Sequence, residues 1–406
     1  MIYLFTLILY AIGLAGDFQF DDFAWIHDPL LCGELPHLHG RPIPSALLGW
    51  MSHIWGVNPM PYKMLGLILH LGVVHMLVNL CKRFEKGSFW VWIFAMHPVL
   101  VSTVAYPIQA SVMMVTLACG WAFMCYDSQK YVICALLLAV ACLCKQNAWV
   151  FPAVLISYEW VVKRKQSVVI PIAIGVIALN WYVFTHDIFD LYTNRLFSPW
   201  TRLTSEGVVG FKYLNMVLLP SVGKYTVCHN VPTVKTSVFL WAWALGFLGY
   251  IWVAGKKGQF TALAIVIMLI PECTFLNLEL CFEHRLYLPL AIVAVSIPEP
   301  RHNRFHIPII VWLMIVNLQY QWIWMSQERM WKHTVENHPS YRAHQNYAKV
   351  IYRDKPLLAL YHFNQATKYI DKSSIRWYKE LQAVFKYWYA VEINKEVVKF
   401  DKSITP

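Results

Sequence analysis

The chain has 406 residues, of which 58% are hydrophobic and only 14% are charged. Soluble domains carry about 25% charged residues, so this composition excludes a soluble globular enzyme and a disordered chain. The net charge of +11 would suggest nucleic acid in a soluble protein, but most basic residues here lie in short loops and in a polar tail, and no nucleic-acid partner is expected. The composition predicts a polytopic membrane protein in a lipid bilayer.

Eleven apolar runs are predicted to form transmembrane helices, since one span needs about 20 mostly apolar residues. They cover approximately residues 1–15, 62–81, 89–105, 110–126, 131–145, 147–162, 167–186, 237–254, 260–277, 285–298 and 307–325. The shorter run 207–221 is interrupted by polar residues and predicts a re-entrant or interfacial segment. The first run lacks a preceding basic residue, which favours an uncleaved span over a signal peptide.

Basic residues fall in alternate loops of this arrangement. These loops contain Lys82, Arg83, Lys86, Lys130, Lys163, Arg164, Lys165, Lys256, Lys257, Arg301 and Arg304. Because cytoplasmic loops are enriched in Lys and Arg, that side is predicted to be cytoplasmic. The segments 16–61, 187–236 and 326–406 are then extracytoplasmic.

The polar tail is predicted to be helical. Ala359, Phe363 and Ala366 have the spacing of one helix face, and Ala343 and Tyr347 begin a similar cluster earlier in the chain. The two clusters predict a helical hairpin similar to one tetratricopeptide repeat, and 373–400 predicts a further amphipathic helix. The predicted fold is therefore all-α, with a transmembrane domain over 1–325 and a small helical domain over 326–406.

An acidic motif follows the first span directly. Gly16 to Phe23 contains Asp17, Asp21 and Asp22. Adjacent carboxylates at a membrane interface repel each other, which raises one pKa and suits a general base. A solvated acidic loop that helps the first span to translocate is the simpler alternative.

Cationic and polar residues lie at the ends of other spans on the same predicted side. They are Arg41, His97, Lys145, Glu283, His284 and Arg285. Each one alone could be an interfacial side chain that reaches to water, but charges at membrane depth are costly and usually functional. Carboxylates can accept a proton from a hydroxyl, and cations can hold a departing phosphate. Together they predict transfer of a sugar from a polyprenyl-phosphate carrier to an acceptor hydroxyl.

The order of these motifs resembles the GT-C class of membrane glycosyltransferases, most closely the O-mannosyltransferases with C-terminal tetratricopeptide repeats. The matching pieces are Gly16–Asp22, Arg41–Pro42, His97–Val99, Lys145–Gln146, Glu283–Pro289 and the tail from Trp331 to Asp371. The resemblance implies a catalytic acid in the first outer loop, a dolichyl- or undecaprenyl-phosphate sugar donor, a protein Ser or Thr acceptor and inversion at the sugar.

This resemblance and the chemistry assign roles to the candidate residues. Asp21 is the expected base, and Asp22 orients the acceptor or tunes Asp21. Arg285, Lys145, His97 and Arg41 are expected to bind the donor phosphate. Asp17, Glu283 and His284 are expected to contact the acceptor or support the site.

Metal, compartment and rival functions complete the predictions. Asp17, Asp21, Asp22, His27, Asp28, His37 and His39 could supply metal ligands, yet the resemblance implies an enzyme that requires neither metal nor another cofactor. The small size favours a bacterial inner-membrane protein, with the endoplasmic reticulum as the alternative. A transporter or flippase for lipid-linked sugars and a non-catalytic envelope assembly factor are the competing functions.

Overall fold

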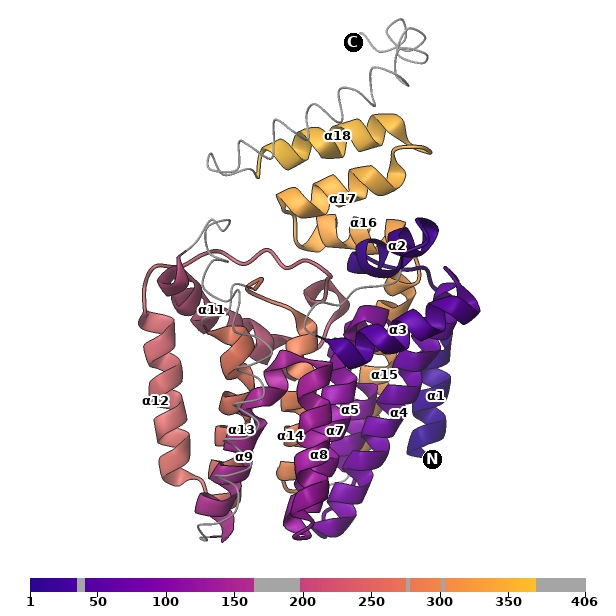
Figure 1. Cartoon of the computed structure of the whole chain (residues 1–406). Helices are drawn as coiled ribbons and strands as arrows, with labels where there is room; N and C mark the ends of the chain where they lie inside the picture. The colour runs from indigo at the N-terminus through magenta and orange to yellow at the C-terminus, as the bar shows by residue number, and fades with distance from the viewer. Residues whose placement is uncertain (35–40, 164–197, 275–277, 301–303, 370–406) are drawn as a thin grey trace, which may run out of the picture. The chain divides into compact units, whose positions relative to one another are not determined.

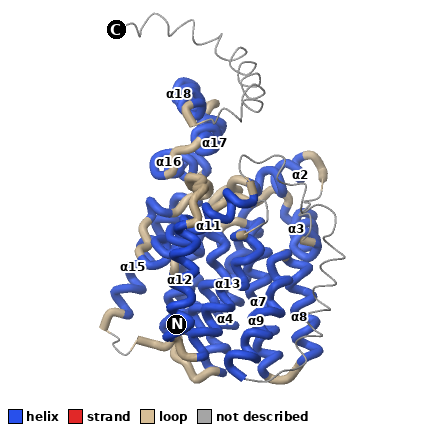
Figure 2. The backbone as a smooth tube through the Cα atoms, turned by 90° about the vertical axis from the view of Figure 1, so that its left-hand side faces the viewer, coloured by secondary structure: helices blue, strands red, loops and turns tan. Residues whose placement is uncertain are grey.

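The computed structural model describes residues 1–34, 41–163, 198–274, 278–300 and 304–369. Within these ranges the chain forms 17 α-helices and no strand (Figure 2). The all-α class predicted from the sequence is confirmed. The chain divides into two compact units, Met1–His338 and Pro339–Pro406.

The long helices of the first unit run mostly side by side (Figure 1). Its helices are α1 (Ile2–Ala11), α2 (Asp28–Leu31), α3 (Pro42–Trp55), α4 (Pro59–Arg83), α5 (Phe89–Met96), α6 (Val101–Val104), α7 (Ala110–Asp127), α8 (Tyr131–Cys144), α9 (Phe151–Tyr158), α11 (Pro199–Leu218), α12 (Val238–Val253), α13 (Lys256–Cys273), α14 (Tyr287–Ser296), α15 (His306–Trp324) and α16 (Gln327–Asn337). Buried apolar side chains of α7, α8, α9, α13 and α14 form one continuous cluster between these helices.

Three segments are long and apolar enough to cross a membrane: α4, α15 and Pro107–Asp127, which joins a 3-10 turn to α7. Three shorter apolar helical segments, Ile2–Ala15, Tyr131–Cys144 and Val238–Val253, accompany them. The described residues therefore contain far fewer full-length spans than the eleven predicted from apolar runs. The predicted run 167–186 lies outside the described residues.

The shortfall arises because apolar runs are longer than the helices that they form. The run 89–105 breaks after α5, where His97 has an extended backbone (φ −68°, ψ 124°) because the residue before a proline avoids the helical region. Lys145 is likewise extended (φ −162°, ψ 141°) and ends α8. The run 285–298 yields only the ten residues of α14. Hydropathy detects these segments but not the breaks that shorten their helices.

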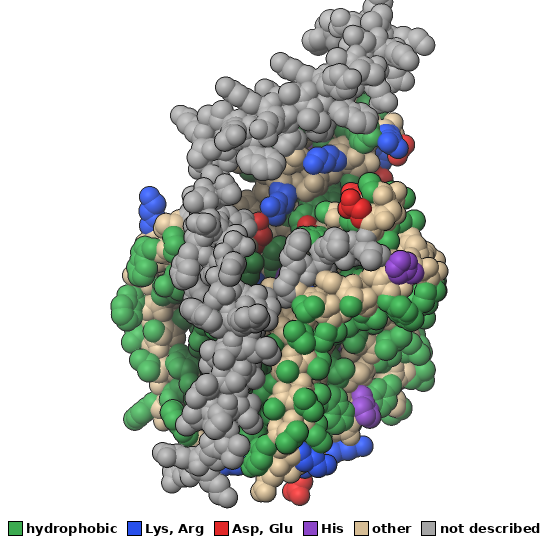
Figure 3. All heavy atoms as spheres, viewed as in Figure 1, with side chains coloured by type: hydrophobic (Ala, Val, Ile, Leu, Met, Phe, Trp, Pro, Cys, Tyr) green, Lys and Arg blue, Asp and Glu red, His purple; other side chains and the backbone are tan. Residues whose placement is uncertain are grey.

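The basic loop residues that the structure describes lie together at one end of the first unit. Asp127, at the end of α7, pairs with Arg83 at 2.6 Å and with Lys163 at 2.9 Å. Lys86 donates a hydrogen bond to the carbonyl of Val295 at 2.7 Å. It is also close enough to Lys257 for the two positive charges to repel each other. The loops that alternate along the chain therefore also lie on one side of the helices in space. The candidate site residues lie at the opposite ends of the same helices. Figure 3 shows apolar side chains on the flank and charged ones toward the two ends.

The second unit contains the helical hairpin that the tail pattern predicts. Its helices are α17 (Tyr341–Ile351) and α18 (Pro356–Thr367). The apolar residues used for the prediction, Ala343, Tyr347, Ala359, Phe363 and Ala366, are all buried. Helix α16, which the sequence analysis places in the tail domain, belongs to the first unit instead. The predicted helix over 373–400 lies outside the described residues.

Candidate functional site

The acidic motif forms a tight loop against the end of α15. A Cβ atom on Gly16 would lie 2.7 Å from the Cα of Met325, so only glycine permits this approach. The Asp17 N–H donates to the Met325 carbonyl at 3.2 Å. Phe20 has a left-handed backbone (φ +44°), which is uncommon for a residue with a side chain and turns the chain sharply before the acidic pair.

The two acids of the pair have different surroundings. Asp22 is fully buried, and its carboxylate accepts the backbone N–H groups of Gln19 at 3.1 Å and Ile108 at 3.3 Å. Burial raises the pKa of Asp22, although these hydrogen bonds and the nearby Lys63 ammonium oppose the rise. Asp21 is only partly buried, and its backbone N–H donates to the Tyr106 hydroxyl at 2.9 Å. Asp22 therefore shapes the loop, and Asp21 is the acid that reaches its edge.

A buried ionic cluster lies at the same end of the helices. Lys145 pairs with Glu272 at 2.5 Å. Arg285 lies 3.9 Å from Glu272 and 3.7 Å from Glu206, both measured from guanidinium nitrogen to carboxylate oxygen. Arg202 pairs with Glu206 at 3.0 Å and is itself buried. Because ions out of water are costly unless compensated, this alternation of signs is what permits three cations in one buried place.

Arg285 is largely committed to the protein in this structure. Its Nη1 donates to the Leu280 carbonyl at 2.8 Å, and its Nη2 donates to the Glu279 carbonyl. Arg202 binds the Leu278 carbonyl in the same segment. The guanidinium predicted to bind phosphate directly thus holds the backbone of 278–280 as well.

Arg41 connects the acidic loop with the ionic cluster. It precedes α3 and is only partly buried, and its Nη1 lies 3.5 Å from the Ser111 hydroxyl. Burial lowers the pKa of its guanidinium, while the negative charges of Glu272 and Asp21 raise it, so Arg41 interacts electrostatically with both. Arg41 is therefore a predicted phosphate ligand that interacts electrostatically with both the predicted base and the cluster, and it is partly accessible.

His284 lies beside the same cluster. Its ring stacks on Phe282 with centroids 5.1 Å apart. Burial, followed by the positive charge of Lys145, lowers the pKa of His284 well below its ordinary value. A neutral imidazole can donate or accept one hydrogen bond beside the cations without adding to their mutual repulsion.

His97 and Glu283, by contrast, have local partners. His97 Nδ1 accepts the Val99 N–H at 3.2 Å, so Nε2 carries the proton and donates to the Val217 carbonyl at 3.1 Å. Glu283 accepts the Thr226 N–H at 2.7 Å and the Tyr320 hydroxyl at 3.0 Å. Both side chains are buried, and the geometry gives them a role in packing 97–102 and 226–229 against the helix ends. Asp17 is exposed beside Lys63.

Tyr106, Lys63, Glu206 and Glu272 complete the site, and the sequence analysis does not name them. Lys63 and Glu272 lie within or beside apolar runs, and a charge in such a run is a recognisable signal. Tyr106 offers no comparable signal in a chain with 22 tyrosines. Only the fold brings it to the acidic loop.

Metal ligands do not gather in the part of the chain that the structure describes. No group of three or more His, Cys, Asp or Glu side chains there is placed to hold a metal ion. His27 pairs with Asp28 at 3.0 Å rather than with the acidic pair. His37 and His39 lie outside the described residues.

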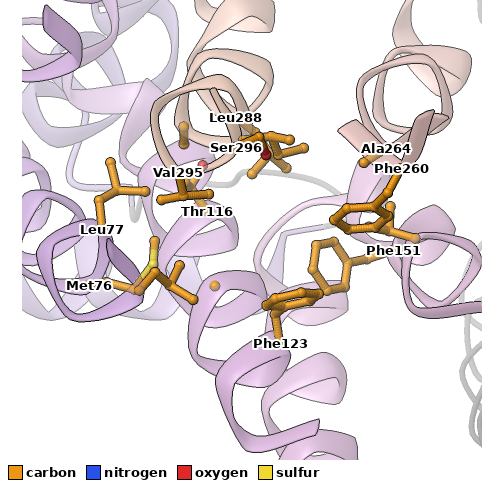
Figure 4. A pocket seen from close by; sticks show the side chains of 15 residues that line it. Met76, Leu77, Thr116, Phe123, Phe151, Phe260, Ala264, Leu288, Val295 and Ser296 are labelled. Carbon is orange, nitrogen blue, oxygen red and sulfur yellow. The ribbon is translucent and has the colours of Figure 1, made fainter. Parts of the chain in front are cut away.

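An apolar cavity of about 60 Å³ lies deeper among the helices. Figure 4 shows the rings of Phe123, Phe151 and Phe260 along one side and Met76 and Leu77 across from them. Leu288, another lining residue, follows Arg285 by three residues, roughly 5 Å along a helix axis. No family model, curated protein or solved structure matches this chain.

Proposed function

We propose that this protein is an inverting membrane glycosyltransferase that moves a sugar from a polyprenyl-phosphate carrier to a Ser or Thr hydroxyl of a protein. The proposal rests on the buried cluster in which Lys145 pairs with Glu272 at 2.5 Å, and on Arg41, whose charge interacts with both Glu272 and Asp21. A potential base and potential phosphate ligands meet at one end of an apolar helix bundle. Few reactions other than transfer from a lipid phosphate need that combination.

The proposed step assigns one task to each group. The acceptor oxygen attacks the anomeric carbon while Asp21 takes its proton. The bond from that carbon to the phosphate oxygen breaks, and polyprenyl phosphate leaves with the electron pair. Arg41 and Lys145 stabilise the departing phosphate, since charge-assisted hydrogen bonds strengthen as its negative charge grows. Attack opposite the leaving group inverts the sugar configuration.

The remaining features support a lipid-linked donor. The apolar cavity beside α14 has room for a few carbon atoms of an isoprenoid chain and is lined almost wholly by apolar side chains, which keeps such a cavity dry. Arg285 and Arg202 fix the 278–280 backbone next to the phosphate position. The α17–α18 hairpin, similar in pattern to one tetratricopeptide repeat, would bind the acceptor protein or stabilise the fold. No metal is required in this mechanism.

We place the site on the extracytoplasmic face of a bacterial inner membrane, since the basic loops lie at the opposite end of the helices. We further propose that about eleven segments cross the membrane in a GT-C arrangement. It requires several helices shorter than 18 residues to cross the bilayer with their flanking turns.

The experiment is turnover by purified protein in nanodiscs, with a panel of radiolabelled polyprenyl-phosphate hexoses and a Ser/Thr-rich peptide. Asp21→Asn should lower kcat on the order of 10²–10⁴-fold, because one general base contributes about that much. Asp28→Asn is the matched control: Asp28 begins α2 shortly after the acidic loop, is exposed, and pairs only locally with His27 among the contacts described. Equal activities for wild type and Asp21→Asn would remove the proposed base, and no transfer with any donor would remove the function.

A further inference from the structure

Residues 106–108 form hydrogen bonds with both acids of the pair. They can do so because the helical backbone is interrupted at Tyr106. Tyr106 precedes Pro107 and has an extended backbone (φ −107°, ψ 101°) between α6 and a 3-10 turn. Its ring packs against Trp324 with centroids 5.6 Å apart. The side chain is therefore fixed at the helix ends, where the first loop folds over it.

This segment forms two different hydrogen bonds with the acidic loop. The Ile108 N–H binds the carboxylate of the buried Asp22 at 3.3 Å. The Tyr106 hydroxyl accepts the Asp21 backbone N–H at 2.9 Å, and the Asp21 carboxylate lies close enough to the phenol to interact with it electrostatically. A hydroxyl that accepts the N–H still has its own proton to donate, and the Asp21 carboxylate is an acceptor beside it. One phenol thus contacts both the backbone and the side chain of the proposed base.

We propose that Tyr106 is the positioning residue of the acidic loop, whose hydroxyl holds the Asp21 carboxylate in its ionised form and in one orientation. The inference rests on the proposed function for its catalytic meaning. A carboxylate that accepts a hydrogen bond is favoured over its protonated form. The phenol itself stays protonated, because burial and the negative charges of Asp21 and Asp22 raise the pKa of Tyr106.

Other charged groups around Asp21 set the background for this effect. Asp22 repels it, and the Arg41 guanidinium attracts it. Lys63 faces Asp22 and Asp17 from α4. None of these groups is altered when the Tyr106 hydroxyl alone is removed, so a change on its removal reports the phenol.

The test needs no substrate. Dicyclohexylcarbodiimide adds only to protonated carboxyl groups, and tandem mass spectrometry locates the adduct on Asp21 or Asp22. Labelling of Asp21 across pH 2.5 to 9 gives the pH at which half of it is protonated. In Tyr106→Phe that midpoint should rise by about one pH unit, the shift expected from a lost hydrogen bond to the charged form.

The matched control is Tyr62→Phe. The Tyr62 hydroxyl donates to the Gly56 carbonyl at 2.8 Å, and its ring contacts Phe18 of the same loop. It should lose comparable thermal stability without moving the labelling midpoint. A folded Tyr106→Phe protein with the wild-type midpoint would overturn the inference and leave Tyr106 a packing residue.

A second variant covers the chance that Tyr106→Phe does not fold. Tyr106→His keeps a ring with an N–H donor. Its labelling midpoint should be closer to the wild-type midpoint than to the midpoint of a variant whose side chain cannot donate a hydrogen bond. If transferase activity is present, Tyr106→Phe should also lower kcat roughly tenfold or more with the KM for donor unchanged. Labelling does not depend on turnover. If the Tyr106→Phe midpoint shifts but no sugar transfer is found, the proposed function is rejected and the positioning role of Tyr106 stands.

Discussion

The two ends of the first unit solve the same electrostatic problem in different ways. At the basic end, Asp127 pairs with Arg83 and Lys163, whose side chains are about one third exposed. At the other end, Glu206 and Glu272 pair with Arg202, Lys145 and Arg285, whose side chains are 0–6% exposed. Exposed pairs contribute little to stability, and buried ones are costly to assemble. The costly end is therefore where a function is to be sought.

The largest expected effect concerns the sides of the membrane that the two ends face. Reporter fusions after Thr233 and after Pro406 should be extracytoplasmic, whereas a fusion after Lys257 should be cytoplasmic, since basic loops are retained inside. The result is all or none at each position. A cytoplasmic signal at Thr233 would put the acidic loop on the wrong side for the proposed reaction.

The next effect compares stability at the two ends. Glu272→Gln leaves Lys145 and Arg285 with less compensation in a buried place and should cost about 3–5 kcal/mol of unfolding free energy. Asp127→Asn removes partners that water can replace and should cost about 1 kcal/mol or less. Unfolding of both variants in mixed micelles, monitored by tryptophan fluorescence, measures the difference. Similar losses would contradict the distinction drawn between the ends.

A third prediction uses pH. Burial raises the pKa of Glu283 from 4.5 to about 7. A raised pKa means that the folded state binds the proton more tightly, so this stabilisation is complete below about pH 4.5 and is lost as pH rises through 7. Glu283→Gln should therefore remove pH dependence on the order of 2–3 kcal/mol between pH 4.5 and 8.

The control for this pH series is Glu336→Gln. Glu336 is exposed and lies 4.0 Å from Lys332, so its removal should leave the pH dependence unchanged. Equal slopes for the two variants and the wild type, in thermal unfolding at several pH values, would show that Glu283 titrates as it does in water.

The smallest expected effect is on donor affinity. Arg41→Lys replaces a planar fork by a point charge at the proposed phosphate and should weaken binding about tenfold. Arg83→Lys makes the same change at the basic end and should leave binding unaltered. Binding of farnesyl phosphate to the protein in nanodiscs distinguishes the two, and equal affinities would remove Arg41 from the phosphate site.

Sequence reasoning identified the long apolar helices and named some of the charged residues that the fold brings together. Uninterrupted apolar runs predicted α4, α7 and α15, and the spacing of buried residues predicted the α17–α18 hairpin. The breaks at His97 and Lys145 were visible as polar residues, but the shortened helices around them were not. Hydropathy is summed along the chain, while a helix ends at a single residue whose backbone leaves the helical region, as His97 and Lys145 do.

The predicted site residues separate for a geometric reason. Glu283 and Arg285 are two residues apart in the 3-10 turn Glu283–Leu286, where residues i and i+3 align and residues i and i+2 face different ways. Arg285 therefore joins the ionic cluster, and Glu283 turns toward Tyr320 and Thr226. A sequence motif does not show the direction in which each side chain points. Tyr106 could not be found from the motif because it lies far from the acidic loop along the chain.

The attachment of the first loop to α15 has a consequence for synthesis of the protein. Gln19 Nε2 donates to the Trp324 carbonyl at 3.0 Å, a contact between residues 305 positions apart. The acidic loop leaves the ribosome among the first segments, yet its partner is made near the end of the first unit. At about 5–20 residues per second, that interval is on the order of 15–60 seconds. We expect the nascent chain to stay inactive through that interval, and truncations before residue 324 to insert into the membrane without gaining activity.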